Sequence, residues 1–409
     1  MSERAPLLSL DDALQRLLQG AAGHAITETE TVSTFDGLGR LLAAEVRSEL
    51  DVPSADNSAM DGYALRAADA AAGALLPVTQ RIPAGVVGQP LAPNTAARIF
   101  TGAPIPAGAD AVLMQEQAES LPGEGLGAVR VREAPGQGDW IRRRGEDVRA
   151  GDVVLAPGTR LTPQALGLAA SVGAATLQVQ RRPRVALLST GDELVMPGEP
   201  LKAGAIYNSN RFMLRALLQA AGCECTDLGI VPDQLQATRE ALRQAAQGHD
   251  LILSSGGVSV GEEDHLKPAV TAEGRLALWQ VAIKPGKPLA FGAVGDTLFV
   301  GLPGNPVSSF VTFLLCVSPL LRALQGADPA LPAGLPLRAD FDTPKADKRR
   351  EFLRVRLNAA GGLELFRNQS SGVLTSAVWA DGLVDNPPGQ LIRAGDTVRF
   401  LPLASLLAR

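Results

Sequence analysis

The strongest constraint on the fold is an alternation of two patterns between Arg184 and Gly326. Short apolar runs typical of buried strands alternate there with amphipathic segments whose apolar residues recur at helical spacing. This alternation predicts a central α/β sandwich domain around a parallel sheet, with its ligand in the loops beyond the carboxyl ends of the strands. The expected strands are Val185–Ser189, Cys225–Val231, Leu251–Ser254 and Leu298–Gly301, and the expected helices are Arg211–Ala221, Leu235–Gln247 and Pro306–Leu324.

Four segments of this region join an apolar strand to a glycine-rich turn that is followed by a carboxylate or a helix. They are Leu187–Leu194, Leu228–Asp233, Leu253–Asp264 and Val300–Ser309. Glycine lets backbone N–H groups point at an anion, so four such turns on one sheet edge predict a phosphate-binding rim, although a single one would more often be a plain turn. No Walker loop and no G-x-G-x-x-G string occurs, which argues against a kinase or a dehydrogenase. The candidate substrate-binding residues on the rim are Ser255, Gly256, Gly257, Pro303, Gly304, Asn305 and Pro306.

Six acidic residues are expected on or near this rim: Asp192, Glu193, Asp233, Glu262, Glu263 and Asp264. Carboxylates repel phosphates unless a cation lies between them, so the cluster implies Mg²⁺ as a cofactor. For any one of these acids a helix cap or a solvated charge is an equally good interpretation, and for Asp192 a cap in particular.

Two lysines, Lys284 and Lys287, lie on a turn that Pro285 and Pro288 stiffen. Because the backbone that carries both ammonium groups has little freedom, the turn suits a phosphate or an oxyanion. A solvated surface turn is the equal alternative when the lysines are taken alone.

The rest of the chain predicts further domains. Leucines at helical spacing from Leu7 to Leu18, a capping box of Ser9 with Asp12, and Gly20 at the end predict an N-terminal helix. We expect it to pack with a second helix at Pro163–Val172 in a small mixed lobe, with a β-rich domain inserted between them and an all-β domain at the C-terminus. The tetrapeptide Arg-Ala-Gly-Asp precedes a β run at Arg149–Asp152 and again at Arg393–Asp396, which indicates a shared turn. The expected boundaries are residues 1–26, 45–54 and 148–180 for the lobe, 27–44 and 55–147 for the inserted domain, 181–328 for the α/β domain and 329–409 for the last.

Composition limits the classes of function. The chain of 409 residues has a net charge of −5, which argues against nucleic acid as the main partner. Three cysteines and three histidines disfavour a Cys/His metal site and point to a hard cation held by oxygen. The N-terminus has no basic-then-apolar signal, so we expect a cytoplasmic protein. The most apolar stretch, Val307–Leu321, is too short to span a bilayer and predicts a buried core helix, hence no membrane partner.

Seven polar strings, in this order, carry a family resemblance. They are DNSAMDGYA from Asp56, RIFTGAPIP from Arg98, RRRGEDV from Arg142, STGDEL from Ser189, GGVSVGEED from Gly256, IKPGKP from Ile283 and LPGNPVS from Leu302. Together they resemble the MoeA family of molybdopterin molybdenumtransferases. The resemblance implies a homodimer of four-domain subunits that takes adenylylated molybdopterin and molybdate, releases AMP and leaves molybdenum on the dithiolene sulfurs of the pterin.

The resemblance also assigns residues. It implies catalytic roles for Asp61, Thr101, Asp147, Glu193 and Lys284, Mg²⁺ ligation by Asp233 and Asp264, and nucleotide binding by the turn that contains Pro303 and Pro306. Two positions depart from the family pattern, because Gln280 stands where a lysine is often found and His265 where a tyrosine is often found. One positive charge that could contact molybdate is therefore absent at Gln280. The alternatives are the adenylylating enzyme that makes the substrate, and a dimeric scaffold protein of the same family.

Overall fold

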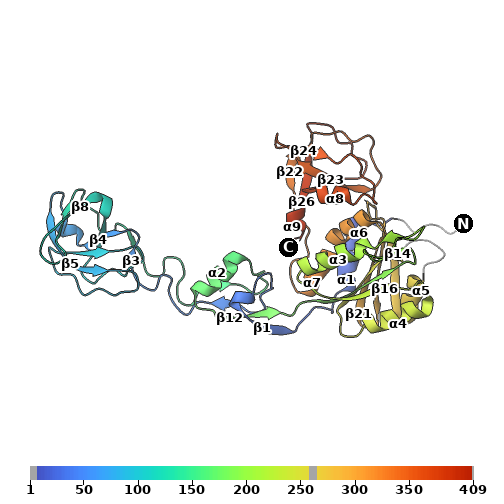
Figure 1. Cartoon of the computed structure of the whole chain (residues 1–409), viewed down its shortest axis with the longest axis horizontal. Helices are drawn as coiled ribbons and strands as arrows, with labels where there is room; N and C mark the ends of the chain where they lie inside the picture. Colours follow the sequence, from blue (N-terminus) through green and yellow to red (C-terminus); the bar gives the residue numbers. More distant parts are fainter. Residues whose placement is uncertain (1–6, 258–264, 408–409) are drawn as a thin grey trace. The chain divides into compact units, whose positions relative to one another are not determined.

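The computed structural model describes residues 7–257 and 265–407 of the chain. The chain divides into two compact units, each visible in Figure 1. Unit 1 contains the residues up to Glu30 and those from Gln180 onward, and unit 2 contains Thr31–Val179. Unit 2 is therefore one continuous insertion in the sequence of unit 1. The finer division into four domains remains a prediction.

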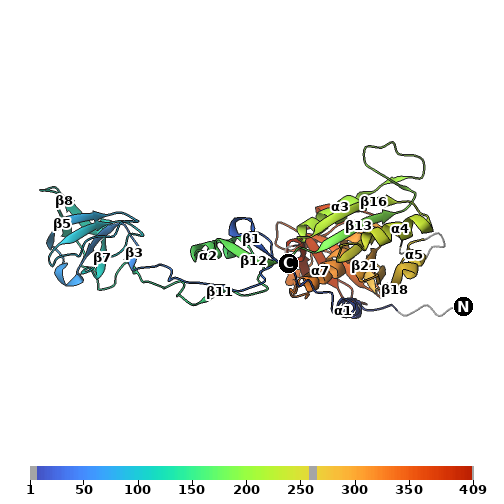
Figure 2. The ribbon, with the colours of Figure 1, turned by 90° about the horizontal axis from the view of Figure 1, so that it is seen from below.

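The α/β part of unit 1 is built on a six-stranded sheet in the order β16-β13-β17-β21-β20-β18 (Figures 1 and 2). The first four strands are parallel, as predicted. At one edge β20 runs antiparallel to β21, and β18 runs antiparallel to β20; these two strands were not predicted. The sheet is therefore mixed, and its parallel part carries the predicted strands. Their bounds are β13 Arg184–Thr190, β16 Glu224–Val231, β17 Leu251–Ser255, β18 Gly274–Gln280, β20 Pro288–Val294 and β21 Thr297–Leu302.

Helices cover both faces of this sheet. Along β13, Val185 and Leu187 belong to one apolar core and Ala186 and Leu188 to the other, because successive side chains of a strand point to opposite faces. The first core receives α1 (Leu10–Gly20), α3 and the helical segment 306–324, and the second receives α4 and α5. The bounds are α3 Ser209–Ala220, α4 Leu235–Ala245 and α5 Leu266–Glu273, of which the last was not predicted.

The helical segment 306–324 is the most apolar helix described. It begins at Pro306, as predicted, and consists of α6 (Pro306–Thr312), a π-helical turn (Phe313–Val317) and α7 (Ser318–Leu324). Its length and composition would allow it to cross a membrane, but 94% of its most apolar 18-residue window is buried inside the protein. The prediction of a core helix is therefore confirmed.

The N-terminal helix α1 (Leu10–Gly20) begins as predicted, with the Ser9 hydroxyl accepting the Asp12 N–H at 3.0 Å. Its buried residues Leu10 and Leu17 belong to the first core of the α/β part, whereas α2 (Pro163–Ser171) belongs to a core of unit 2. The expectation that these two helices pack together is therefore wrong. Local helical spacing identifies an apolar face but not the surface that covers it.

The C-terminal part of unit 1 is a second sheet, in the order β19-β23-β25-β26-β22, with β24 added to β23. Strand β19 comes from the lysine turn of the α/β part and pairs in parallel with β23, so it joins the two parts. The expected all-β composition is corrected by two short helices, α8 (Thr375–Trp379) and α9 (Leu403–Leu407). The strands are β19 Ile283–Lys284, β22 Leu335–Arg338, β23 Arg350–Leu357, β24 Leu363–Leu365, β25 Gly382–Asn386 and β26 Thr397–Pro402.

Unit 2 is β-rich, as predicted. Its main sheet has the order β7-β4-β6-β5-β9-β8, in which only β5 and β6 pair in parallel. The helix α2 packs on the two-stranded pairs β2·β11 and β1·β12 in a separate core of the same unit. The main strands are β4 Gly62–Leu65, β5 Leu75–Ile82, β6 Ala96–Ile99, β7 Ala111–Met114, β8 Ala118–Leu121 and β9 Ala128–Val131. The short strands are β1 Thr29–Ser33, β2 Val46–Arg47, β3 Asn57–Ser58, β10 Ile141–Arg142, β11 Val153–Leu155 and β12 Thr176–Gln180.

Candidate functional site

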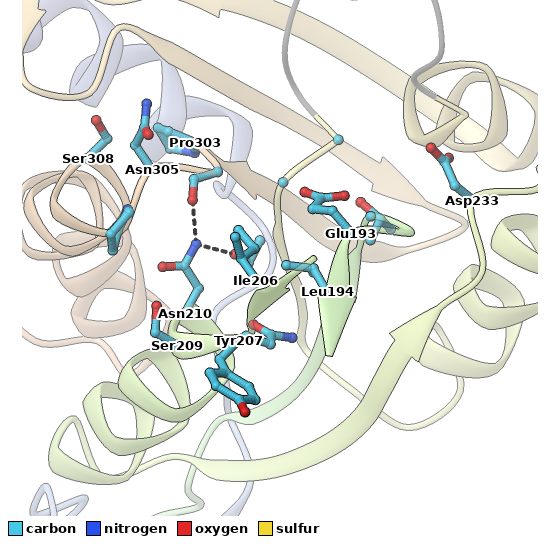
Figure 3. A pocket seen from close by; sticks show the side chains of 18 of the residues that line it. Glu193, Leu194, Ile206, Tyr207, Ser209, Asn210, Asp233, Pro303, Asn305 and Ser308 are labelled. Carbon is cyan, nitrogen blue, oxygen red and sulfur yellow. Dashed lines mark hydrogen bonds between the residues drawn. The ribbon is translucent and has the colours of Figure 1, made fainter. Parts of the chain in front are cut away.

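A cavity of about 560 Å³ opens where the parallel strands β13, β17 and β21 end at their carboxyl termini (Figure 3). This is the edge at which the sequence predicted the ligand, and parallel strands bring their following loops together there. Nine of the predicted site residues line the cavity: Glu193, Asp233, Ser255, Gly256, Gly257, Pro303, Gly304, Asn305 and Pro306.

Two glycines after β17 allow the chain to turn closely against β13. Gly256 and Gly257 have φ angles of +88° and +69°, which side chains rarely adopt. A Cβ atom on Gly257 would lie 2.8 Å from the Oγ1 atom of Thr190, and one on Gly256 would lie 3.0 Å from the Thr190 carbonyl oxygen. The turn therefore requires glycine for space as well as for conformation.

The turn from Pro303 to Pro306 is held from two sides. The Ser309 hydroxyl, one turn into α6, donates to the Pro303 carbonyl oxygen. Asn210 of α3 donates its amide N–H groups to the Gly304 carbonyl oxygen at 2.7 Å and to the Ser255 hydroxyl at 2.9 Å (Figure 3). Asn210 thus ties the loop after β17 to the loop after β21.

The asparagines Asn208 and Asn210 line the cavity and were not predicted. The sequence carried a signal only for Asn208 as a helix N-cap, because asparagine is favoured at that position, and its oxygen does accept the Arg211 N–H at 3.1 Å. Ile206 and Tyr207 of the short strand β15 (Ile206–Tyr207), which pairs with β14 (Leu194–Val195), also line the cavity without having been predicted.

Three carboxylates belong to this edge. Glu193 and Asp233 line the cavity, and the Asp233 N–H donates to the Asp192 carboxylate at 3.2 Å. Asp192 is therefore not a helix cap, since it joins the loop after β13 to the loop after β16. Within residues 7–257 and 265–407 none of the three forms an ion pair, so their charge is not neutralised by this part of the protein.

The described residues contain no group of three or more His, Cys, Asp or Glu side chains arranged to hold a metal ion. The predicted metal ligand Asp233 is one of the described residues. Its expected partner Asp264, with Glu262 and Glu263, lies outside the described residues.

Lys284 is not one of the described residues that line the cavity. It lies in β19, which pairs with β23. Its ammonium group donates to Glu351 at 2.8 Å and lies 3.3 Å from Asp347. Burial opposes the charge, but the hydrogen bonds and negative charges of Glu351 and Asp347 outweigh it and raise the pKa of Lys284. The second lysine of the turn, Lys287, is half-buried and forms no ion pair with the residues that the structure describes.

The other three predicted residues lie in unit 2. The Asp61 carboxylate accepts both the N–H and the hydroxyl of Thr101 at 2.8 Å, and these two hydrogen bonds lower the pKa of Asp61. The structure therefore brings Asp61 and Thr101 together, 40 residues apart in sequence. Asp147 is exposed, and its backbone N–H donates to the Val52 carbonyl oxygen.

Comparisons with known proteins agree with this architecture. Three family models match in sequence order: the MoeA N-terminal region (domains I and II) over residues 8–173, a probable molybdopterin binding domain over 186–323, and the MoeA C-terminal region (domain IV) over 336–403. The molybdopterin molybdenumtransferase of Haemophilus influenzae is 41% identical over 98% of this chain and 100% of its own length. The molybdopterin molybdenumtransferase 2 of Mycobacterium tuberculosis is 40% identical over 87% of this chain and 90% of its own.

A solved structure extends the match to the fold. The molybdopterin biosynthesis MoeA protein of Pyrococcus horikoshii OT3 superposes with a TM-score of 0.81 at 30% identity, covering 97% of this chain and 99% of that one. The three family models, the two relatives and the solved structure all indicate the same family. The chain therefore belongs to the MoeA family and has a role in molybdenum cofactor biosynthesis.

Proposed function

We propose that this protein is a Mg²⁺-dependent molybdopterin molybdenumtransferase, which takes adenylylated molybdopterin and molybdate and releases AMP. The observation that carries the proposal is the cavity at the carboxyl edge of the sheet, where two tight turns meet two carboxylates that form no ion pair with the described residues. A relative named molybdopterin molybdenumtransferase matches 98% of the chain, which supports the proposal.

The two turns suit the anionic part of such a substrate. The backbone of Ser255, Gly256 and Gly257 approaches the cavity without a Cβ atom at either glycine, so its N–H groups can come close to phosphate oxygens. The turn from Pro303 to Pro306 is rigid, because Asn210 and Ser309 both bind its carbonyl groups. These contacts would hold the phosphoanhydride in place while it is cleaved.

The carboxylates fit a hard cation. Glu193 and Asp233 offer oxygen ligands at the cavity, and no cation among the described residues neutralises them. Asp233, with the predicted Asp264, would hold Mg²⁺, which would neutralise the charge that develops on the phosphate oxygens. Glu193, which faces the same cavity, would orient a hydrogen-bond donor of the substrate.

We also propose a cytoplasmic homodimer. In unit 2, Phe35 is 93% exposed and Leu38 is 59% exposed. Phe35 lines a cavity together with Leu166 and small residues such as Ala170. Phe35 and the apolar lining of this cavity form one contiguous exposed surface, and contiguous apolar surface of this kind is typical of a protein–protein interface. A second copy would also bring another set of the unit 2 residues Asp61, Thr101 and Asp147 into the assembly.

The decisive test is AMP release by the purified protein from adenylylated molybdopterin, with and without molybdate and Mg²⁺. Release that requires Mg²⁺ and depends on molybdate supports the proposal. Consumption of ATP with free molybdopterin would identify the adenylylating enzyme instead. An absence of both reactions, with binding of the pterin intact, would favour the scaffold.

A further inference from the structure

We infer that Arg81 and Arg98 form a binding site for a doubly charged oxyanion on the main sheet of unit 2. Arg81 belongs to β5 and Arg98 to β6, and the two residues are partners in the parallel register of these strands. Their side chains therefore leave the same face of the sheet. The inference rests on the proposed function only for the identity of the oxyanion.

One aromatic ring lies under both guanidinium groups. The guanidinium carbon of Arg81 lies 4.5 Å from the centre of the Phe100 ring, and that of Arg98 lies 4.8 Å from the same centre. Arg98 also lies over the ring of Tyr63, at 5.2 Å. A guanidinium group over an aromatic face keeps its in-plane N–H groups available for hydrogen bonds. Phe100 therefore holds two sets of donors close to each other.

The arginine pair, Arg81 and Arg98, has no carboxylate partner. Neither residue forms an ion pair within residues 7–257 and 265–407. Arg98 donates to two neutral acceptors, the Gly62 carbonyl oxygen at 3.1 Å and the Gln115 side-chain oxygen at 2.9 Å. Arg81 is exposed and has no hydrogen bond to this part of the protein.

This arrangement costs free energy unless an anion binds to it. Like charges at paired positions of neighbouring strands destabilise a sheet. The other arginine in the strands of this sheet, Arg130 of β9, is paired, because its guanidinium group lies 3.3 Å from the Glu119 carboxylate. An anion that contacts both Arg81 and Arg98 would relieve their repulsion.

The arginine pair lies beside the predicted catalytic residues of unit 2. Thr101 follows Phe100 directly, and its N–H and hydroxyl both donate to the Asp61 carboxylate at 2.8 Å. These hydrogen bonds and, to a smaller extent, the charge of Arg98 lower the pKa of Asp61, so Asp61 is ionised at neutral pH. One carboxylate beside two guanidinium groups leaves this part of the surface with a net positive charge.

The charge and the donors together indicate the class of ligand. Each guanidinium group can donate two parallel N–H bonds to the oxygen atoms of an oxyanion. Under the proposed function the protein meets two doubly charged ions of this kind, molybdate and the phosphate group of AMP. Both are tetrahedral and have only acceptor oxygens, so the shared chemistry is a tetrahedral oxyanion. The two sources are distinguished by using each as a separate probe.

The test is equilibrium dialysis of the full-length protein with molybdate and, separately, with AMP. Arg81→Gln removes one guanidinium charge from an exposed position, and Arg81→Lys keeps the charge but not the paired donors. Arg130→Gln is the matched control, because it removes the same charge from the strand next to β5, where a carboxylate already neutralises it. The thermal midpoint of each variant reports on the fold.

We expect Arg81→Gln to unfold at nearly the wild-type temperature and to bind at least one probe roughly three- to tenfold more weakly. Arg81→Lys should lie between Arg81→Gln and wild type, and Arg130→Gln should bind both probes as wild type does. A loss confined to molybdate assigns the site to molybdate, and a loss confined to AMP assigns it to phosphate. Equal losses assign it to either oxyanion.

Three results would overturn the inference. The first is that Arg81→Gln binds both probes as wild type does, or that wild type binds neither. The second is that Arg130→Gln weakens binding as much as Arg81→Gln. The third is a thermal midpoint of Arg81→Gln that falls together with its affinity, which would indicate a structural role. Failure of wild type to release AMP from adenylylated molybdopterin, with the expected binding effects intact, would count against the proposed function alone.

Discussion

Replacement of Lys284 by methionine is expected to destabilise the junction between the α/β part and the C-terminal sheet. The Lys284 ammonium group is the cation that binds Glu351, whose side chain is 6% exposed. The pair lies where β19 is aligned with β23, with Lys284 directly opposite Glu351. Without the lysine, Glu351 would keep a buried carboxylate whose remaining side-chain hydrogen bond among the described residues comes from the Asn386 amide at 3.5 Å.

The size of the effect follows from burial. Removal of one partner from a fully buried ion pair costs roughly 3–5 kcal/mol. Lys284 is 35% exposed, and solvent screens part of its interaction, so we expect about 2 kcal/mol here. Glu351→Gln in the Lys284→Met background removes the unpaired buried charge and should recover about half of the lost free energy of unfolding. Lys287→Met on the same turn is the matched control and should leave stability unchanged, because Lys287 forms no ion pair with the described residues.

Denaturant unfolding of the four proteins measures these differences. The pKa of Lys284 is raised above its ordinary value of 10.5, so the stabilisation is complete below pH 10.5 and is lost only as the pH rises through the higher folded value. The difference between wild type and Lys284→Met should therefore be constant from pH 6 to 9 and shrink in strong alkali. Equal stability of wild type and Lys284→Met at pH 7 would refute the reasoning.

Three further predictions concern the site. Gly257→Ala should abolish substrate binding and lower the free energy of unfolding by about 1–2 kcal/mol, because the new Cβ atom would contact Thr190 and the residue has a positive φ angle. Gly248→Ala, where φ is +75° and the space is open, is the control in calorimetry and denaturant unfolding. Equal effects of both variants would show that the contact with Thr190 does not matter. Asp264→Asn should lose Mg²⁺-dependent AMP release yet still bind adenylylated pterin, whereas Glu263→Gln should remain active. Near-normal turnover of Asp264→Asn across a Mg²⁺ titration would reject Asp264 as a metal ligand. Heterodimers of Asp61→Ala with Asp264→Ala should recover part of the activity if subunits share the site, and no recovery after confirmed subunit exchange would argue against sharing.

Features set by neighbours in the sequence could be predicted. The turns at Arg149–Asp152 and Arg393–Asp396 have the same structure, because in each the aspartate carboxylate accepts the arginine N–H, at 2.9 and 2.8 Å, and the glycine has a φ angle near +95°. The capping box of α1 is equally local. The cavity edge was predictable for a related reason, since the loops after parallel strands meet at one edge whatever the rest of the chain does.

Features set by distant residues could not be predicted. The core face of α1 packs in the α/β part, and a contact of Gly20 explains part of its sequence: a Cβ atom there would lie 2.3 Å from the ring of Phe291. The sequence had suggested a different reason for Gly20, namely that glycine commonly ends a helix. Asn210 likewise owes its place to Ser255 and Gly304, which are 45 and 94 residues away.

The lysine turn shows how a local prediction of chemistry can be redirected by such contacts. Lys284 was expected to meet an oxyanion, but it already binds two carboxylates, so an anion there must compete with Glu351 and Asp347. Lys287, on the same stiffened turn, has no such competitor among the described residues. If both lysines served the anion equally, the two methionine variants would raise the half-saturating molybdate concentration alike. Because a cation that is already paired gives less free energy to a new anion, Lys287→Met should raise it more, while Lys284→Met loses mainly stability.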